Sequence, residues 1–281
     1  MAHRIGVIGG DGIGPDVIAE GLKVIGAAGV ELETVDYDLG GARYGRDGTV
    51  LPDEVIEEWR SLDALYLGAV GTPEVPPGLI ERGLLLKMRF ALDLYVNLRP
   101  FVYPAGGIDF RVVRENTEGF YADRNMFVGS GEFMPTPDVA LAVGVFTRDA
   151  CERIARRAFA LAQGRRKHVT IVHKTNVLAL TTGLFRDACR SVAEDFPDVH
   201  VDEEHIDALT APLVRRGSDF DVIVAENMFG DILSDLAGEL SGSLGMAPSL
   251  NASETKAMAQ AAHGSAPDIA GRNRANPTAL L

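Results

Sequence analysis

Cysteine, tryptophan and long apolar runs are all scarce in this sequence. Cys151 and Cys189 are the only cysteines among 281 residues, and there is one tryptophan. Two cysteines cannot form a disulfide framework and both fall inside expected helices, so we expect buried thiols and a reducing, cytoplasmic compartment. No apolar run approaches the roughly 20 residues of a membrane span, and Asp11 interrupts the N-terminal apolar stretch before it could act as a signal peptide.

Positive charge is also in short supply. The chain has 27 Lys and Arg against 40 Asp and Glu, a formal net charge of −13. This balance argues against nucleic acid or an anionic membrane as a partner. Against the acidic background, Arg89, Arg99, Arg114 and Lys174 stand out, and they allow a local basic pocket. A chain of 281 residues commonly divides into two domains.

Apolar strand-like runs alternate with helical patterns, which predicts an α/β fold with a parallel sheet. One series runs through RIGVIG, LETVDY and DALYLGA, and a second through HVTIVHK, HVDEEH and DFDVIVA. We expect helices over 148–162 and 180–196 and across LIERGLLLKMRFAL. The segment NLRPFVYPAGG is rich in Pro and Gly without periodicity, so we interpret it as a crossing between domains.

The N-terminal stretch IGVIGGDGIGPDVI combines an apolar strand, a glycine cluster and the start of a helix. Gly10, Gly12 and Gly14 would let the backbone approach a phosphate in front of the helix N-terminus. Asp11, however, places a negative charge where a pyrophosphate would lie, and the glycines do not keep the spacing G-x-G-x-x-G. Two interpretations stay open: a nucleotide-binding loop, and a tight strand-to-helix turn beside a site.

The stretch AENMFGDILSDLAGEL carries the strongest local signal. Asp231 and Asp235 are four residues apart at an expected helix start, so both carboxylates project from one face. The apolar Ile232, Leu233 and Leu236 are expected to turn to the core. Two close carboxylates repel each other, and a hard divalent cation between them would compensate for that repulsion. The alternative is that Asp231 caps a helix whose outer face is acidic.

Two further strand ends carry ionisable side chains. In IVHKTNVL, Lys174 ends a very apolar strand, where it could act as a base if buried or point its ammonium group into solvent. The nearby His168 and His173 lack the spacing of metal ligands, so we treat both as structural.

The stretch VVRENTEGFY ends another strand with Arg114 and continues to Tyr121. Arginine at a strand end suits a bidentate contact with a carboxylate, and the tyrosine could donate a proton. The alternative is a surface ion pair of Arg114 with Glu115 or Glu118. Residues 118–137 carry aromatics and methionines without a clean period, which favours a functional loop or an interface arm.

The loop HGSAPDIAG is punctuated by glycine and proline, and its one acidic side chain is Asp268. Exposed N–H groups there could wrap an adenosine moiety, and a carboxylate can accept hydrogen bonds from both ribose hydroxyls. The residue types alone identify only a loop and not its ligand.

Together these segments resemble the decarboxylating dehydrogenases of β-hydroxy acids, whose branches act on isopropylmalate, isocitrate, homoisocitrate and tartrate or D-malate. The resemblance runs in order through GGDGIGPDV, LLKMRFALDLYVNLRP, RENTEGFY, HKTNVL, EEHIDALT, NMFGDILSDLAGELSGSLGMAPS and HGSAPDIAG. It implies an isopropylmalate-dehydrogenase-like two-domain fold, not a standard Rossmann fold. The implied domains are 1–94 with 242–281 on the cofactor side, ending before helices that complete it in the family, and 95–241 for substrate, metal and dimerisation.

The resemblance also implies a role for each candidate residue. The expected activity is the NAD- and divalent-metal-dependent oxidative decarboxylation of a 3-substituted (2R)-malate, in a homodimer whose sites share Lys174 and Asp207. The matching position of Asp268 implies a preference for NAD over NADP. The implied site comprises catalytic Tyr121 and Lys174; substrate-binding Leu85, Leu86, Arg89, Arg99 and Arg114; the Mg²⁺ or Mn²⁺ ligands Asp207, Asp231 and Asp235; and cofactor-binding His263, Gly264, Ser265, Ala266, Pro267, Asp268 and Asn276.

The substituent on the substrate stays open at this point. Isocitrate enzymes resemble one another in having a serine and an asparagine at two positions that hold the further carboxylate of isocitrate. Gly83 and Leu85 occupy the matching positions here, so an apolar group such as isopropyl would fit. RENTEG and LLKMR instead resemble the isocitrate and tartrate or D-malate branches, which remain alternatives. A non-catalytic paralogue or regulatory subunit is the alternative of a different class. The presence of every implied site residue favours the enzyme.

Overall fold

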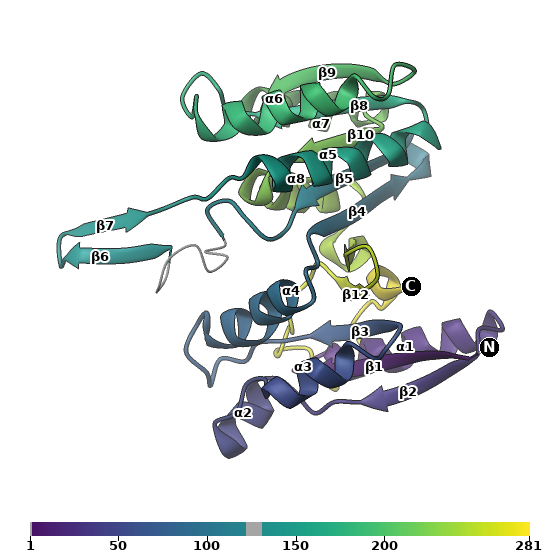
Figure 1. Cartoon of the computed structure of the whole chain (residues 1–281). Helices are drawn as coiled ribbons and strands as arrows, with labels where there is room; N and C mark the ends of the chain where they lie inside the picture. The colour runs from purple at the N-terminus through teal and green to yellow at the C-terminus, as the bar shows by residue number, and fades with distance from the viewer. Residues whose placement is uncertain (1, 122–130) are drawn as a thin grey trace. The chain divides into compact units, whose positions relative to one another are not determined.

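The computed structural model describes residues 2–121 and 131–281, and it divides into two compact units (Figure 1). Unit 1 comprises Met1–Leu94 and Ser243–Leu281, and unit 2 comprises Tyr95–Gly242. The polypeptide therefore leaves unit 1, forms all of unit 2, and returns. In the described part of the chain, no helix is both long and apolar enough to cross a membrane.

Unit 1 is built on five strands in the order β2-β1-β3-β12-β11. Strands β2, β1, β3 and β12 run parallel, and β11 pairs antiparallel with β12. The strands are β1 (His3–Gly10), β2 (Leu32–Asp36), β3 (Ala64–Ala69), β11 (Pro248–Ala252) and β12 (Ala257–Ala261). The helices are α1 (Gly14–Ala27), α2 (Gly41–Asp47), α3 (Asp53–Trp59) and α4 (Lys87–Ala91), with a π-helix over Glu81–Leu86 and 3-10 turns over Leu244–Met246 and Thr278–Leu280.

The sheet of unit 1 has an apolar core on each face. Alternate residues of β3 enter different clusters, since Leu65 and Leu67 pack with Trp59, whereas Tyr66 packs with Val17. A strand covered on both faces has no solvent-facing position, which accounts for the uninterrupted apolar run ALYLGA.

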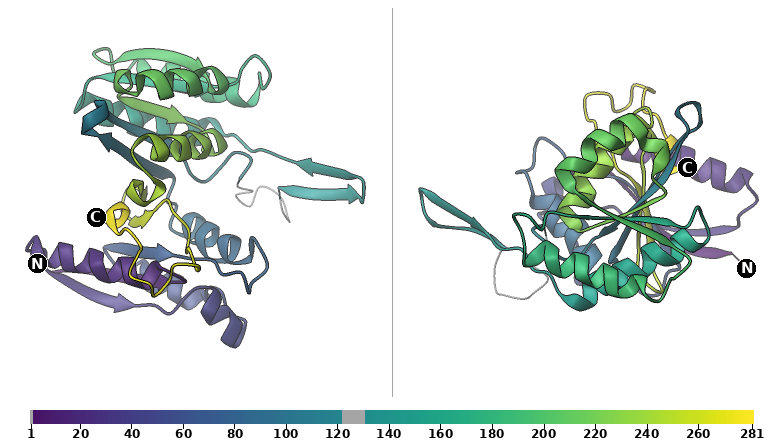
Figure 2. Two further views of the ribbon diagram at one scale, coloured as in Figure 1. Left: turned by 180° about the vertical axis from the view of Figure 1, so that it is seen from behind. Right: turned by 90° about the horizontal axis from the view of Figure 1, so that it is seen from above.

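The main sheet of unit 2 has five strands in the order β4-β5-β10-β8-β9. They are β4 (Val96–Tyr103), β5 (Ile108–Glu115), β8 (His168–His173), β9 (His200–His205) and β10 (Val222–Ala225). Helices α5 (Arg148–Gln163) and α6 (Thr181–Ala193) cover one face, and α7 (Ile206–Arg216) and α8 (Asn227–Leu240) the other (Figure 2). Short 3-10 turns occupy Pro104–Gly106 and Gly217–Asp219, and β6 (Glu132–Thr136) pairs with β7 (Val139–Ala142) in a separate hairpin.

The α/β class expected from the sequence is confirmed, and most strand pairs are parallel as expected, but the pairs β11–β12 and β4–β5 are antiparallel. The segment NLRPFVYPAGG is not an irregular crossing, because most of it forms β4 in an antiparallel pair with β5. Phe101 and Phe110 are directly opposite each other in that pair, both are fully buried, and their rings lie 5.5 Å apart. This cross-strand contact stabilises a hairpin that the Pro and Gly content concealed.

Three local expectations have different outcomes. The helix expected across LIERGLLLKMRFAL is confirmed over residues 79–91, and its stretch Glu81–Leu86 is a π-helix, a rare geometry that often occurs at functional sites. Ile232 is half exposed and does not face the core, whereas Leu233 is fully buried as expected. Residues 132–136 form a strand, while 122–130 of the proposed interface arm lie outside the described residues.

Both cysteines are free and buried, as expected. Burial raises the pKa of the Cys151 thiol to about 12 and also raises the pKa of Cys189. Neither thiol is therefore available as a nucleophile in the folded chain.

Candidate active site

The glycine turn between β1 and α1 is built for contact between backbones. A Cβ atom on Gly10 would lie 1.9 Å from the carbonyl oxygen of Ala69, and one on Gly12 would lie 2.0 Å from that of Ser265. Both glycines have positive φ angles, 75° and 57°. These contacts favour the tight turn over the nucleotide-binding loop, because the close approach is to the chain itself.

Asp11, the acidic residue inside this turn, is a buried anchor. Its carboxylate accepts hydrogen bonds from the backbone N–H groups of Gly41, Ala42 and Gly71, at 2.8, 3.0 and 2.9 Å. Three donors satisfy a carboxylate that is only 6% exposed. The Asp11 carboxylate, whose charge argued against a pyrophosphate, therefore joins the turn to the start of α2 and to the loop after β3.

The loop proposed to bind the cofactor packs directly on this turn. The Ser265 hydroxyl donates to the carbonyl of Gly71 at 2.6 Å, and the Ile13 N–H donates to the carbonyl of Ser265 at 2.8 Å. Asp268, two residues after Ala266, is exposed and available to a ligand. The loop is thereby fixed at Ser265 while its acidic side chain stays open to solvent.

Asn276 is already engaged inside unit 1. Its amide oxygen accepts hydrogen bonds from the N–H and hydroxyl groups of Thr278, at 3.1 and 2.7 Å. Its amide nitrogen lies 3.4 Å from the sulfur of Met246. The remaining loop positions proposed for the cofactor, His263, Gly264 and Pro267, also belong to unit 1.

Three substrate-site candidates fall in the helical segment 81–91 of unit 1. Arg89 is buried in α4, and Leu85 and Leu86 are half buried at the end of the π-helix. The preceding Leu84 is fully buried in the core, and Leu85 packs against the same cluster. The three leucines therefore do not line one surface together.

In unit 2, two buried arginines on neighbouring strands meet one helix. Arg99 of β4 is 5% exposed and Arg114 of β5 is 2% exposed. Arg99 donates to Asp231 at 3.2 Å and lies 3.4 Å from Asp235. Arg114 also donates to Asp231. The two carboxylates of α8 therefore balance two guanidinium groups that are buried in unit 2, and Asp231 contacts both of them.

Asp231 and Asp235 share a face of α8, as their spacing predicted. Burial and the charge of Asp231 raise the pKa of Asp235. Burial lowers the pKa of Arg114, and the charge of Asp231 opposes that shift. The two carboxylates thus repel each other beside the guanidinium groups of Arg99 and Arg114. Each of these four charged groups can give up a contact within the cluster and contact a bound ligand instead.

The start of α8 excludes the capping role considered for Asp231. Glu226 is the N-cap, and its carboxylate accepts from the N–H groups of Met228 and Phe229 at 3.0 and 2.7 Å. Asp231 therefore lies in the second turn. A Cβ atom on Gly230 would be 2.7 Å from the Cβ of Arg114, so glycine at this position lets α8 approach β5 closely.

The surface ion pair considered for Arg114 is also wrong. Glu115 is buried and accepts from the N–H and hydroxyl groups of Thr117 and from the N–H of Glu118. The Glu118 carboxylate accepts from the N–H and hydroxyl groups of Thr147. Both carboxylates therefore stabilise the turn after β5, and Arg114 contacts Asn227 and Asp231 of α8 instead.

Tyr121 lies over this charged cluster. The guanidinium carbon of Arg114 is 5.8 Å from the centre of the Tyr121 ring, within the range of a cation–π contact. Burial and the negative charge of Asp231 raise the pKa of its hydroxyl. The hydroxyl therefore keeps its proton at neutral pH and can serve as a donor.

Lys174 and Asp207 form a separate pair in unit 2. Lys174 follows β8, Asp207 lies in the first turn of α7, and the ammonium group donates to the carboxylate. That hydrogen bond lowers the pKa of Asp207. Among the residues that the structure describes, Asp207 does not gather with Asp231 and Asp235 closely enough for one ion to touch all three.

Sequence reasoning missed three polar residues that complete the arginine cluster. Asn227 accepts from Arg114 at 2.9 and 2.6 Å, and the Ser234 hydroxyl accepts from Arg99 at 2.6 Å. Asn97 accepts from Arg99 at 2.9 Å. Four residues of α8 share one helix face at spacings of four, three and one: Asn227, Asp231, Ser234 and Asp235. Helical periodicity could therefore have identified Asn227 and Ser234 as neighbours of Asp231.

The structure thus combines an α/β fold with a cluster of two buried arginines and two carboxylates. A family model described as isocitrate/isopropylmalate dehydrogenase matches residues 4–281. The chain therefore belongs to the isocitrate/isopropylmalate dehydrogenase family, and the expected class, a decarboxylating dehydrogenase, is confirmed.

Curated relatives resemble the chain over almost all of its length. It is 51% identical to 3-isopropylmalate dehydrogenase of Corynebacterium aurimucosum, over 99% of this chain and 85% of that protein. It is 48% identical to 3-isopropylmalate dehydrogenase of Nocardia farcinica, over 99% of this chain and 86% of that protein.

Solved structures confirm the expected fold. Isocitrate dehydrogenase from Methylococcus capsulatus matches with a TM-score of 0.90 and 39% identity, over 99% of this chain and 82% of that one. A beta-decarboxylating dehydrogenase from Thermococcus kodakarensis matches with a TM-score of 0.83 and 39% identity, over 99% of this chain and 80% of that one.

Proposed function

We propose that this chain catalyses the NAD-dependent oxidative decarboxylation of 3-isopropylmalate. The observation that carries the proposal is the pair of buried arginines, Arg99 and Arg114, which both contact Asp231 of α8. The curated relatives that share about 50% sequence identity with this chain are named 3-isopropylmalate dehydrogenase.

The arginines supply the substrate contacts. A guanidinium group offers parallel N–H donors that match a carboxylate, and burial makes that contact stronger than it would be in water. Arg89, Arg99 and Arg114 would hold the carboxylates of the malate moiety. Leu85 and Leu86 would receive the apolar isopropyl substituent.

The acidic residues suit a divalent cation. Asp231 and Asp235 offer hard carboxylate oxygens on one helix face, the type of ligand that Mg²⁺ and Mn²⁺ prefer. Binding of such an ion would relieve the repulsion between the two carboxylates. We assign three carboxylates as its ligands: Asp231 and Asp235 of one chain, and Asp207 of the partner subunit. When bound, the ion would polarise the hydroxyl and carbonyl oxygens of the substrate.

Tyr121 and Lys174 would move protons. Lys174 would help to remove the hydroxyl proton of the substrate. Tyr121, which holds its proton at neutral pH, would protonate the carbon that loses carbon dioxide.

The cofactor proposal concerns the loop 263–268 and Asn276. Asp268 is exposed and can accept hydrogen bonds from both ribose hydroxyls, whereas the 2′-phosphate of NADP would bring about two negative charges to the same place. A preference for NAD follows. We assign 1–94 with 242–281 to the cofactor and 95–241 to substrate, metal and dimerisation.

A homodimer would complete the site. Lys174 and Asp207 contact each other in one chain but not Asp231, which agrees with a pair that is donated to a partner's site. The β6–β7 hairpin is exposed along its whole length and carries Phe133, Met134 and Leu141, so it offers an apolar arm for the partner. The free thiols agree with a cytoplasmic location.

The experiment is a substrate panel with the purified full chain. NADH formation is measured with 3-isopropylmalate, D-malate, tartrate, isocitrate and homoisocitrate, in the presence of Mg²⁺ and then after exhaustive chelation. We expect the highest kcat/KM with 3-isopropylmalate, at least about a hundredfold lower kcat/KM with NADP, and no turnover without the metal.

The outcomes separate the parts of the proposal. Faster turnover of isocitrate or tartrate would overturn the substrate assignment and keep the reaction class. Equal use of NAD and NADP would overturn the role of Asp268. No turnover with any of the five acids would make the chain a non-catalytic paralogue.

A further inference from the structure

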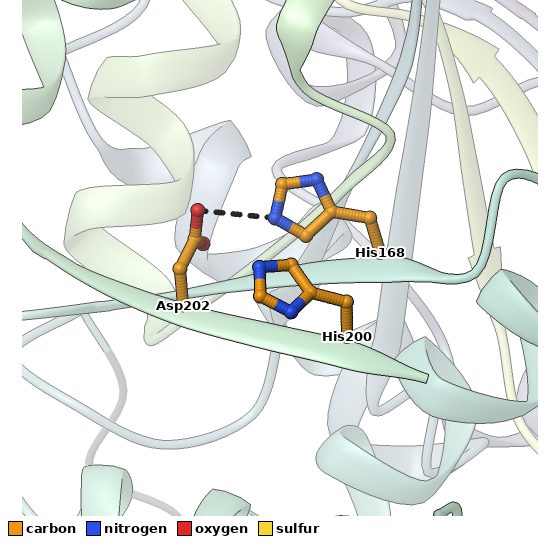
Figure 3. Close-up of side chains that lie close together, drawn as sticks. All are labelled: His168, His200 and Asp202. Atoms are coloured by element: carbon orange, nitrogen blue, oxygen red, sulfur yellow. Dashed lines mark ion pairs between the residues drawn. The ribbon is translucent and has the colours of Figure 1, made fainter. Parts of the chain in front are cut away.

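The start of β8 and β9 carries a cluster that the proposed reaction does not use. His168, His200 and Asp202 each offer one ligand atom, and these atoms all lie within 4.8 Å of one another. Figure 3 shows a ring nitrogen of each histidine turned toward the Asp202 carboxylate. The cluster therefore presents two imidazoles and one carboxylate to a single point.

Strand register creates this arrangement. His168 is the direct partner of His200 in the parallel pair, and Asp202 lies two residues after His200, on the same side of β9. The two imidazole centres are 5.0 Å apart. Because adjacent strands are joined by backbone hydrogen bonds, the three side chains are held close before any ion arrives.

The spacing suits a small transition-metal ion. The Nε2 atom of His168 lies 3.0 Å from a carboxylate oxygen of Asp202. Two ligand atoms that are each about 2.1 Å from a Zn²⁺ ion stand about 3.0 to 3.4 Å apart. Imidazole nitrogens together with a carboxylate are typical ligands of zinc and its first-row neighbours.

Polar atoms at this cluster also lack hydrogen bonds. The Oδ1 atom of Asp202 and the hydroxyl of Thr170 are buried without a hydrogen-bond partner, whereas the Nε2 atom of His168 has only its ion-pair contact with the other carboxylate oxygen of Asp202. Thr170 is fully buried and is the direct strand partner of Asp202. Buried polar atoms are normally satisfied, so the gap at this position points to a missing ligand.

The cluster is distinct from the candidate active site. His168 begins β8, and Lys174 follows its last residue. At about 3.3 Å per residue of strand, the two positions are about 20 Å apart. An ion here would join β9, the outermost strand of the unit 2 sheet, to β8.

We propose that His168, His200 and Asp202 form a second metal site, which binds Zn²⁺ or a similar first-row ion through two imidazoles and a carboxylate. His200 is exposed, so the ion enters from solvent and keeps at least one water or solvent ligand. The role is structural, because an ion that binds only the folded chain stabilises it.

The test is a Zn²⁺ titration of tag-free protein that has been stripped of metal, in excess Mg²⁺ to occupy the carboxylates of α8. Calorimetry should show one Zn²⁺ per chain with a micromolar dissociation constant, and the unfolding midpoint should rise by several degrees at saturation. Co²⁺ in place of Zn²⁺ should give a visible absorption band from the imidazole ligands.

Two variants make the assignment specific. His200→Ala alters an exposed side chain and should weaken Zn²⁺ binding at least tenfold without changing turnover. The matched control is His205→Ala, which removes the other histidine of β9 at a position opposite His173. Equal Zn²⁺ affinity in the parent and in His200→Ala, or no binding to the parent, would overturn the site and leave the cluster as an ion pair.

Discussion

Two aspartates, one in each unit, show how the partners of a carboxylate decide its use. Asp11 in unit 1 accepts three hydrogen bonds from backbone N–H groups. Asp231 in unit 2 accepts from the side chains of Arg99 and Arg114. Backbone donors are fixed by the fold, whereas guanidinium groups can turn to another anion. Asp11 therefore holds the structure, and Asp231 is free to take part in binding.

The same contrast applies to the glycines beside them. Gly12 and Gly230 both lie where a Cβ atom would collide, but with different neighbours. Gly12 meets the backbone of Ser265, which belongs to the loop proposed for the cofactor. Gly230 meets the side chain of Arg114. The first glycine thus sets the position of a loop, and the second sets the distance from a helix to a side chain that we propose binds substrate.

The largest expected effect is on turnover, in Asp231→Asn. Loss of the charge should lower kcat by about a thousandfold, equivalent to about 4 kcal/mol in the activation free energy. Steady-state kinetics with 3-isopropylmalate measures it. Asp16→Ala, an exposed residue of α1, is the control with unchanged kcat. A decrease of less than tenfold in Asp231→Asn would remove this carboxylate from the proposed metal site.

The second effect is on stability, in Asp11→Ala. Three N–H groups, of which that of Gly41 is buried, lose their charged acceptor, and we expect a loss of about 3 kcal/mol in the free energy of unfolding. Urea denaturation measures it, with Asp16→Ala again as the control, expected to lie within about 0.5 kcal/mol of the parent. If both variants unfold at the same urea concentration, Asp11 is not the anchor described here.

The third prediction concerns pH and the N-cap of α8. Burial raises the pKa of Glu226 to about 7 from the 4.5 of an ordinary glutamate. An acid whose pKa is higher in the folded chain stabilises it at low pH, and this contribution is lost as pH rises from about 4.5 through 7. Between pH 5 and pH 8 the loss amounts to about 2 to 3 kcal/mol.

Glu226→Gln isolates that contribution, since glutamine keeps an acceptor for the helix N–H groups and does not titrate. The free energy of unfolding of the parent should fall relative to that of Glu226→Gln as pH rises over this range. Denaturation curves at several pH values provide the measurement. A difference between the two proteins that stays constant with pH would contradict the raised pKa.

The smallest effect separates necessary glycines from tolerated ones. Gly26 lies within α1, and a Cβ atom there meets nothing within 4 Å. Gly26→Ala should therefore stabilise the chain by about 0.5 to 1 kcal/mol through helix propensity. Gly12→Ala, where φ is positive and the space is filled, should instead destabilise it. Thermal unfolding compares them, and equal shifts would refute the distinction.

Local periodicity predicted much of the site. The spacing of Asp231 and Asp235 placed both on one helix face, and the apolar runs located β8 and β10. What local patterns could not supply were contacts between distant segments. Asp11 finds its donors 30 to 60 residues away, and no pattern within GGDGIG specifies them. The pairing of His168 with His200 likewise depends on strand register, which neither stretch determines alone.

The cluster on α8 also has a consequence for electroneutrality. Arg99 and Arg114 carry two positive charges, and Asp231 and Asp235 carry two negative charges when both are ionised. A dicarboxylate that enters alone would leave this partly dehydrated spot doubly negative, and a divalent cation alone would leave it doubly positive. Together they cancel, so each raises the affinity for the other, and by thermodynamic linkage the two enhancements are equal.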